Sequence, residues 1–107
     1  MSIPQSEELN LLHIHVCSAL SDPTRLQILY ALHDEPRNVT NIAQSLDIPQ
    51  STVSRHLSVL RQRSLVTSER NGMAVIYSVT DARIITVLEM MRDILRDVLE
   101  KHSQVIN

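Results

Sequence analysis

The chain has 107 residues, enough for one small domain. A hydrophobic fraction of 43% and a charged fraction of 21% are ordinary for a globular protein, and they exclude a disordered, collagenous or coiled-coil-only chain. The single Cys excludes an intrachain disulfide framework and a Cys-rich zinc module, and the single Gly excludes the Gly-rich phosphate loops of common nucleotide enzymes. No apolar run is long enough to span a membrane and no signal-peptide pattern begins the chain, so we expect a cytoplasmic protein without a membrane partner.

The formal net charge is −2, which by itself argues against a nucleic-acid partner. The charge is unevenly distributed, however. Residues 50–83 carry more basic than acidic side chains, whereas the flanking segments 1–49 and 84–107 carry more acidic ones. A basic segment therefore lies between two acidic segments, and the local motifs must decide whether it binds DNA or is simply solvated.

Four helices are predicted in the first two thirds of the chain. Ser6 can begin a helix that runs to about residue 20, and Ser21-Asp22-Pro23 indicates a second start, since Pro is tolerated at the first helical position after a capping side chain. A short helix follows over 40–46, and a tight connection at 47–49 leads to a helix over about 49–63. The helical spacing predicts an apolar face on the first helix (Leu9, Leu12, Val16 and Leu20) and an inner face on the fourth (Val53, Leu57 and Leu60).

The pattern then changes from helical to strand-like. Residues 65–70 and 73–79 alternate like strands, and Asn71-Gly72 between them predicts a type I′ hairpin turn with positive φ at both residues. Thr80 or Asp81 can cap a last helix that runs to about residue 102. The order α-α-α-α-β-β-α is that of a mainly helical winged helix-turn-helix, with one domain over 1–107, the helix-turn-helix at 40–63 and the wing at 65–79.

The fourth helix carries the candidate DNA-binding face. If its apolar residues pack inward, short or forked hydrogen-bonding side chains remain near its N-terminus, where a recognition helix enters the major groove. We predict that this face and the hairpin tip bind DNA through Gln50, Ser51, Thr52, Ser54, Arg55, His56, Arg70, Asn71 and Gly72. Arg61 and Arg63 either contact phosphates or are solvated. The alternative for the whole face is an ordinary solvated helix surface.

The same segments resemble the ArsR/SmtB family of dimeric winged-helix repressors. The similarity lies in residues 19–29 (ALSDPTRLQIL), in residues 51–61 (STVSRHLSVLR) and in the wing from Arg70 to Tyr77, and it extends over about residues 9–99. It implies a homodimer on a pseudo-palindromic operator that represses transcription until an inducer binds. Asp47 departs from the Gly that the family often has in the turn, but Asp tolerates a left-handed φ.

The last helix carries a candidate dimer seam. Ile84, Leu88, Met91, Leu95 and Val98 repeat with spacings of 4, 3, 4 and 3. The resemblance implies that the first and last helices, residues 1–20 and 81–102, form the dimer. We therefore predict an interface made of Leu12, Val16, Ile84, Leu88, Met91, Leu95 and Val98. The alternative is a helix face that packs only on its own domain.

The resemblance also implies where a metal sensor would lie. The positions of the family's paired Cys match Asn38 and Thr40, and the positions of its ligands on the last helix match Asp81, Arg83, Ile94 and Asp97. Neither set suits zinc or nickel, since thiolates and imidazoles are missing. We expect Arg83 to pair with a carboxylate across the dimer interface in the metal's place.

The remaining metal candidates are His13, Cys17 and His102, so a metal ion is kept only as an alternative and no cofactor is assigned. Cys17 is expected to be a buried structural residue. An enzyme is not expected, because no side chain is placed to orient a Cys17–His pair. An adaptor that has lost DNA binding is disfavoured by the intact Gln50–His56 face. The leading prediction is an inducer-released repressor, and the alternative is a constitutive or partner-controlled regulator with a decayed sensor; the operator and the inducer cannot be derived.

Overall fold

The computed structural model describes residues 2–106, so Met1 and Asn107 of the predicted domain lie outside the described part. The elements in chain order are α1 (Ser6–Leu12), η1 (His13–Cys17), η2 (Ala19–Ser21), α2 (Pro23–Asp34), α3 (Val39–Leu46), α4 (Gln50–Gln62), β1 (Val66–Asn71), β2 (Ala74–Val79) and α5 (Arg83–Ile106). This order confirms the winged helix-turn-helix prediction. The predicted first helix changes from an α-helix to a π-helical turn (η1) and then to a 3-10 turn (η2).

Side-chain oxygens begin α2 and α3. The Asp22 carboxylate accepts hydrogen bonds from the backbone N–H groups of Thr24, at 2.8 Å, and Arg25, at 3.2 Å, which confirms the start predicted from Ser21-Asp22-Pro23. Asn38 caps α3 by accepting from the Asn41 N–H at 2.8 Å. The third helix therefore begins one residue earlier than predicted.

An aliphatic core joins α2, α3, α4 and the hairpin. The largest fully buried side chains are Ile28, Leu29, Ile42, Val53, Leu57, Leu60 and Val66. They come from all three helices and from β1, and the two strands pack on α4 and α2. Val53, Leu57 and Leu60 confirm the predicted inner face of α4. The apolar side of α4 is thus packed in the core, and the opposite side of the helix is exposed to solvent.

The hairpin is antiparallel, with Val66 opposite Val79 and Asn71 opposite Ala74. This register makes Gly72 and Met73 the two turn residues. Gly72 has φ +66°, and among residues 2–106 the non-Gly residues with positive φ are Asp47 and Ser64, so Asn71 has negative φ. The predicted type I′ turn at Asn71-Gly72 is therefore wrong. A positive φ at the first turn residue alone fits a type II′ turn, which requires Gly there.

Backbone hydrogen bonds attach the wing to the chain that precedes α3. The Arg37 N–H donates to the Tyr77 carbonyl at 3.1 Å, and the Tyr77 N–H donates to the Arg37 carbonyl at 2.9 Å. The Arg37 side chain donates to the Ala31 carbonyl at 2.9 Å and to Asn41 Oδ1 at 2.6 Å. The end of α2, the start of α3 and the wing are thereby held together.

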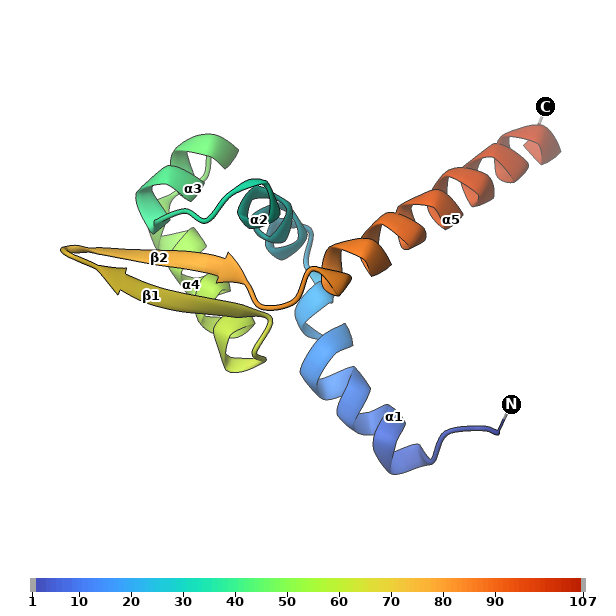
Figure 1. Ribbon diagram of the computed structural model, residues 1–107. Coiled ribbons are helices and arrows are strands. Elements are labelled where there is room, and N and C mark those ends of the chain that lie inside the picture. Colours follow the sequence, from blue (N-terminus) through green and yellow to red (C-terminus); the bar gives the residue numbers. More distant parts are fainter. Residues whose placement is uncertain (1, 107) are drawn as a thin grey trace.

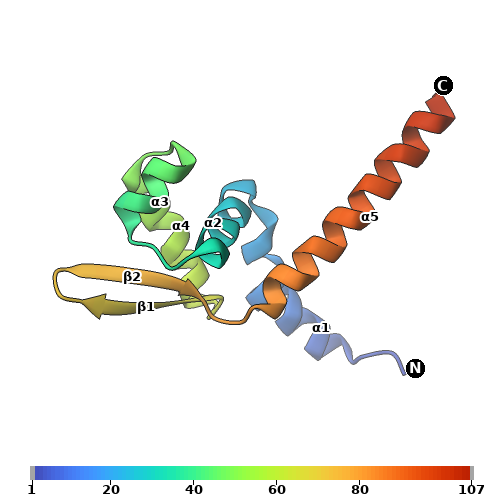
Figure 2. The same cartoon turned by 45° about the horizontal axis from the view of Figure 1, so that its top comes forward.

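The packed unit of α2, α3, α4 and the hairpin is called the body, and two helical segments extend from it. In Figures 1 and 2, α5 extends away from the cluster of α2, α3, α4 and the hairpin, and α1 extends away beneath the start of α5. Ile85 and Leu88, in the first turns of α5, are buried in the core. Beyond Leu88, the α5 side chains up to residue 103 are exposed. No helix in the described part of the chain is long and apolar enough to cross a membrane.

Candidate DNA-binding surface

The outward face of α4 is polar and exposed at its N-terminal end. Gln50, Ser51, Ser54 and Arg55 are exposed, and Thr52 is half-buried. These residues combine hydroxyl and amide groups with one guanidinium, which are the groups that hydrogen-bond to base edges in the major groove. The structure therefore brings five of the six predicted α4 residues onto an accessible surface.

The first turn of α4 also differs from the first turns of α2 and α3. Pro49 occupies its N-cap position, and no side chain caps the helix. The Pro49 carbonyl accepts from the N–H groups of Thr52 and Val53, both at 3.1 Å. An N-terminus without a side-chain cap keeps its first N–H groups available to an anion, and phosphate is the anion that helix N-termini commonly bind.

Asp47 forms the turn between α3 and α4. It has φ 55° and ψ 52°, in the left-handed region, and the Ile48 N–H donates to the Ala43 carbonyl at 3.0 Å. The tolerance of Asp for this conformation was predicted from the sequence, and the observed φ confirms it. The turn that orients α4 against α3 is thus kept without the usual Gly.

His56 was predicted to face solvent, and this is wrong. The residue is only 7% exposed, because it follows Val53 and precedes Leu57 on the boundary of the inner face. Its Nδ1 lies 3.3 Å from Arg25 Nη1, and its Nε2 lies 4.0 Å from Asp22 Oδ1. Within the described chain, His56 therefore contacts α2 rather than the accessible face of α4.

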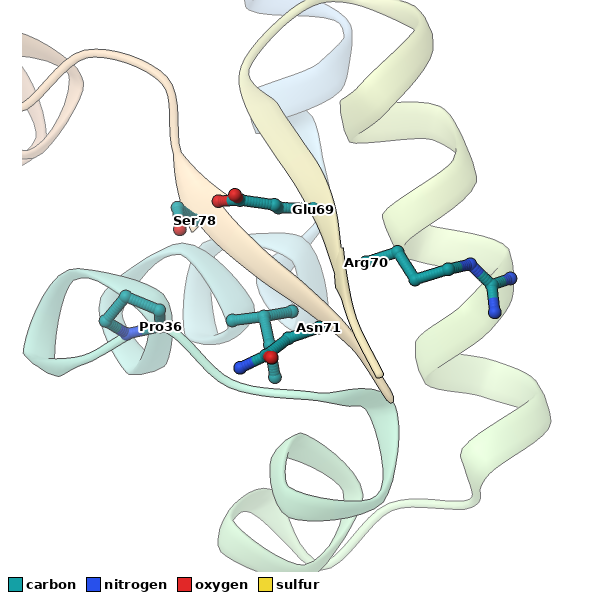
Figure 3. Close-up of a pocket in the computed structure, with 6 residues that line it drawn as sticks. Pro36, Glu69, Arg70, Asn71 and Ser78 are labelled. Atoms are coloured by element: carbon teal, nitrogen blue, oxygen red, sulfur yellow. The ribbon is translucent and has the colours of Figure 1, made fainter. Parts of the chain in front are cut away.

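The three predicted wing residues lie on different sides of the hairpin. Figure 3 shows the Arg70 side chain on the side of β1 that faces α4, while the Glu69 and Asn71 side chains point to the opposite side. All three residues line a surface pocket with Pro36, Ile76 and Ser78. Gly72 forms the turn. Arg70 is exposed and is the wing residue best placed to act together with α4.

The predicted dimer residues are largely uncovered in the single chain. Leu12, Met91, Leu95 and Val98 are about half exposed, and Val16 and Ile84 are partly buried. Leu88 is the exception, since it is 5% exposed and belongs to the core of its own chain. Leu88 therefore anchors α5 to the body and has little surface left for a partner.

Arg83 and Asp81 form an ion pair at the N-terminus of α5, within one chain. Arg83 Nη2 lies 2.7 Å from Asp81 Oδ2, Arg83 Nε lies 3.1 Å from both carboxylate oxygens, and the Arg83 N–H donates to Asp81 Oδ1 at 2.9 Å. The side-chain and backbone bonds from Arg83 lower the pKa of Asp81 to about 2. Within the single chain Arg83 therefore pairs with Asp81, two residues away, and its predicted pairing across the dimer interface stays a prediction.

The residues at the family's metal positions do not fit a metal ion. Asn38 Oδ1 is used as the cap of α3, and the Asp81 carboxylate is held by Arg83. Over residues 2–106, no group of three or more His, Cys, Asp or Glu side chains is placed to hold a metal within one chain, so His13, Cys17 and His102 are not brought together. Cys17 is exposed, so the expectation that it is buried is wrong for the single chain.

Two clusters were missed by the sequence reasoning. Arg25 contacts His56 and the end of the N-terminal helical segment. Tyr30 donates to Glu89 Oε1 at 2.6 Å, Arg92 Nη1 lies 2.7 Å from the same oxygen, and Arg92 lies over the Tyr30 ring at 5.5 Å. Burial, followed by the bond to Glu89, raises the pKa of Tyr30. Only the i, i+3 spacing of Glu89 and Arg92 was visible in the sequence.

Comparison with known proteins agrees with this geometry. Residues 22–68 match the family described as "Bacterial regulatory protein, arsR family". NmtR, an HTH-type transcriptional regulator of Mycobacterium tuberculosis, is 39% identical over 66% of this chain, and the match spans only 59% of NmtR.

Two solved structures extend the comparison to almost the whole chain. The crystal structure of Rv0081 from M. tuberculosis has a TM-score of 0.79 and 32% identity, covering 91% of this chain and 98% of that one. The solution structure of Mb0332 from Mycobacterium bovis, described as a homodimeric winged helix-turn-helix DNA-binding domain, has a TM-score of 0.76 and 26% identity, covering 94% and 95%. The chain belongs to the arsR family of bacterial regulatory proteins.

Proposed function

We propose that a homodimer of this chain binds double-stranded DNA at a pseudo-palindromic operator and represses transcription there. The observation that carries the proposal is the exposed polar N-terminal face of α4, with Arg55 on it and Arg70 directed toward the same helix. This function needs access to chromosomal DNA, so the proposed compartment is the cytoplasm.

The N-terminal half of α4 is proposed to read bases. Arg55 is the side chain suited to bidentate contact with guanine, and Gln50 is suited to adenine. Ser51, Thr52 and Ser54 are short enough to let the helix approach the base edges. The uncapped N–H groups of the first turn, together with Arg61 and Arg70, would contact phosphates and fix the register of the helix on the duplex.

The dimer is proposed to form through α1 and α5. Beyond Leu88, α5 carries six apolar side chains that are each more than half exposed: Met90, Met91, Ile94, Leu95, Val98 and Leu99. Leu9, Leu11, Leu12 and Ile14 on the N-terminal segment are similarly uncovered. An apolar surface this extensive is typical of an interaction site. Because a two-fold dimer presents two equal α4 helices, the operator would contain two half-sites about one helical turn apart.

Release by an inducer is part of the leading proposal, but one observation favours the alternative of a constitutive or partner-controlled regulator. Arg83 already occupies the Asp81 carboxylate at the start of α5. A cation site there would have to displace a guanidinium that donates through two nitrogens. A metal-controlled switch at this position is therefore the form of regulation that the chain supports least.

The test is fluorescence anisotropy with the promoter upstream of the chain's own gene, at several fixed salt concentrations. We expect binding that weakens steeply as salt rises, because phosphate contacts release counterions. A scrambled duplex of the same length is the control. Equal affinity for both duplexes, or affinity that does not change with salt, would contradict the proposal.

The same assay separates the two forms of regulation. Zinc, nickel, cobalt, cadmium, copper(I), arsenite and a chelator are added in turn to the complex. Release by one of the metals would support an inducer and would direct mutagenesis to His13, Cys17 and His102. Tight binding in the presence of every metal would favour the constitutive or partner-controlled form.

A further inference from the structure

Arg25 links the N-terminal helical segment to the recognition helix. Its Nε donates to the Ala19 carbonyl at 2.7 Å and its Nη2 donates to the Ser18 carbonyl at 3.2 Å, while Nη1 lies 3.3 Å from Nδ1 of His56 on α4. Ala19 is buried, and a buried carbonyl is normally hydrogen-bonded, so the bond from Arg25 is made to a backbone group that is shielded from water. One side chain from α2 thus holds both the end of the segment that leads from α1 and the middle of α4.

The chemistry of the pair fixes the state of the His56 ring. A guanidinium can only donate hydrogen bonds, so Nδ1 must be the acceptor and the ring proton must lie on Nε2. Nε2 lies 4.0 Å from Oδ1 of Asp22, which is itself the cap of α2. The His56 ring therefore lies next to two side chains at the start of α2, those of the cap residue Asp22 and of Arg25.

We propose that Arg25 and His56 set the orientation of α4 relative to the N-terminal helical segment (α1, η1 and η2), whose α1 is proposed to form part of the dimer interface. His56 is a positioning residue in this proposal, and it does not contact bases. The proposal rests on the proposed DNA-binding function, since the orientation matters only if two α4 helices of a dimer must fit two half-sites at once. Without the contacts of Arg25 each α4 could still bind DNA, but the distance between the two α4 helices of the dimer would vary.

The test compares His56→Leu with His56→Gln. Leu fills a similar volume but cannot accept the Arg25 hydrogen bond, whereas Gln offers Oε1 as an acceptor. Operator affinity is measured on the natural promoter and on the same promoter with one base pair inserted between the half-sites. The matched control is His33→Leu, which makes the same change on the exposed face of α2.

We expect the wild type and His33→Leu to bind the natural spacing much more tightly than the altered one. His56→Leu should lose about tenfold in affinity for the natural promoter and much of this preference, because interaction energies between coupled side chains are of this size. His56→Gln should recover both. The dimer dissociation constant, measured by sedimentation equilibrium, should stay unchanged. Wild-type spacing preference in His56→Leu would overturn the proposal.

A second measurement needs no variant. Histidine ring ¹⁵N shifts of the wild-type protein report the tautomer directly, and His56 should carry its proton on Nε2. A proton on Nδ1 would remove the acceptor and overturn the proposal, even if His56→Leu failed to fold. Failure of the wild type to bind its promoter would instead contradict the proposed function, and the ring shifts would still report whether the link exists.

Discussion

The body of the molecule and its two outer helices use apolar residues in opposite ways. In α2, α3, α4 and β1 the large aliphatic side chains are buried within one chain, and side-chain oxygens cap two of the three helices. In α1 and most of α5 the same residue types are exposed, and the buried apolar residues of the described part of α5 are Ile85 and Leu88, in its first turns. The body is thus complete in one chain, whereas the outer helices need a second surface to cover them.

The largest expected effect of a single substitution lies in the body. Leu57→Ala removes a side chain that is 1% exposed, and it should lower the free energy of unfolding by about 3 kcal/mol, since a buried cavity is left behind. Urea unfolding followed by circular dichroism measures this loss.

Leu99→Ala on α5 is the matched control, because this Leu is 58% exposed in the single chain. Its effect should depend on protein concentration, since it acts through the dimer. A loss for Leu99→Ala that equals the loss for Leu57→Ala at every concentration would contradict the contrast between the two regions.

A charge among the exposed apolar residues of α5 from Met90 to Leu99, called the stripe below, should weaken the homodimer without unfolding α2, α3, α4 and the hairpin. In Leu95→Glu a carboxylate replaces a side chain that is 53% exposed, and it should weaken dimerisation by about 100-fold, because the charge would be buried at the proposed interface. Sedimentation equilibrium gives the dissociation constant, and near-ultraviolet or NMR spectra report the body. Thr86→Glu, an exposed position outside the stripe, serves as the control. An unchanged dimer in Leu95→Glu would place the interface elsewhere.

On the body, Arg55→Ala should remove base reading while leaving the dimer intact. Operator affinity should fall by about 10- to 100-fold, the cost of one lost bidentate contact, and discrimination between operator and scrambled DNA should fall with it. Arg61→Ala, the same change near the other end of α4, should weaken both duplexes equally if it removes a phosphate contact. If Arg55→Ala lowered affinity for both duplexes equally, Arg55 would be a phosphate contact instead.

The sequence was a good guide to the body and a poorer one to single side chains at its edges. Helical spacing identified Val53, Leu57 and Leu60 as the inner face of α4 because burial follows periodicity. It missed His56, since a His on the boundary of a helix is placed by its partner, and Arg25 lies 31 residues away in the sequence. Likewise, the heptad pattern could not tell that Leu88 is covered by its own chain while Leu95 is not, because both belong to the predicted dimer seam.

The wing offers a test of intermediate size. Gly72 has φ +66° with nothing near the position of a Cβ, so Gly72→Ala meets no steric obstacle but must adopt a positive φ that residues with a Cβ rarely take. We expect a loss of about 1 kcal/mol in the free energy of unfolding. Asn71→Ala is the control, because Asn71 has negative φ and needs no special conformation. Equal losses in the free energy of unfolding for Gly72→Ala and Asn71→Ala would mean that the turn does not depend on a positive φ at Gly72.

The smallest effect is expected where the body meets α5. The hydrogen bonds from the Arg83 side chain, followed by its backbone N–H, lower the pKa of Asp81 from 3.8 to about 2. The ionised form is therefore favoured in the folded protein, and the stability it contributes is present above about pH 4 and lost as the pH falls toward 2. Asp81→Asn keeps a side chain that can cap α5 but cannot form the ion pair.

Urea unfolding across this pH range should therefore show the wild type more stable than Asp81→Asn at pH 7 and equal to it near pH 2. The difference should also shrink in high salt, because Arg83 is 88% exposed and its charge is screened. A difference that stayed constant with pH would mean that the ionisation of Asp81 contributes nothing to the free energy of unfolding. In that case the start of α5 would owe nothing to the ion pair, and Arg83 could leave Asp81 at no cost to the fold.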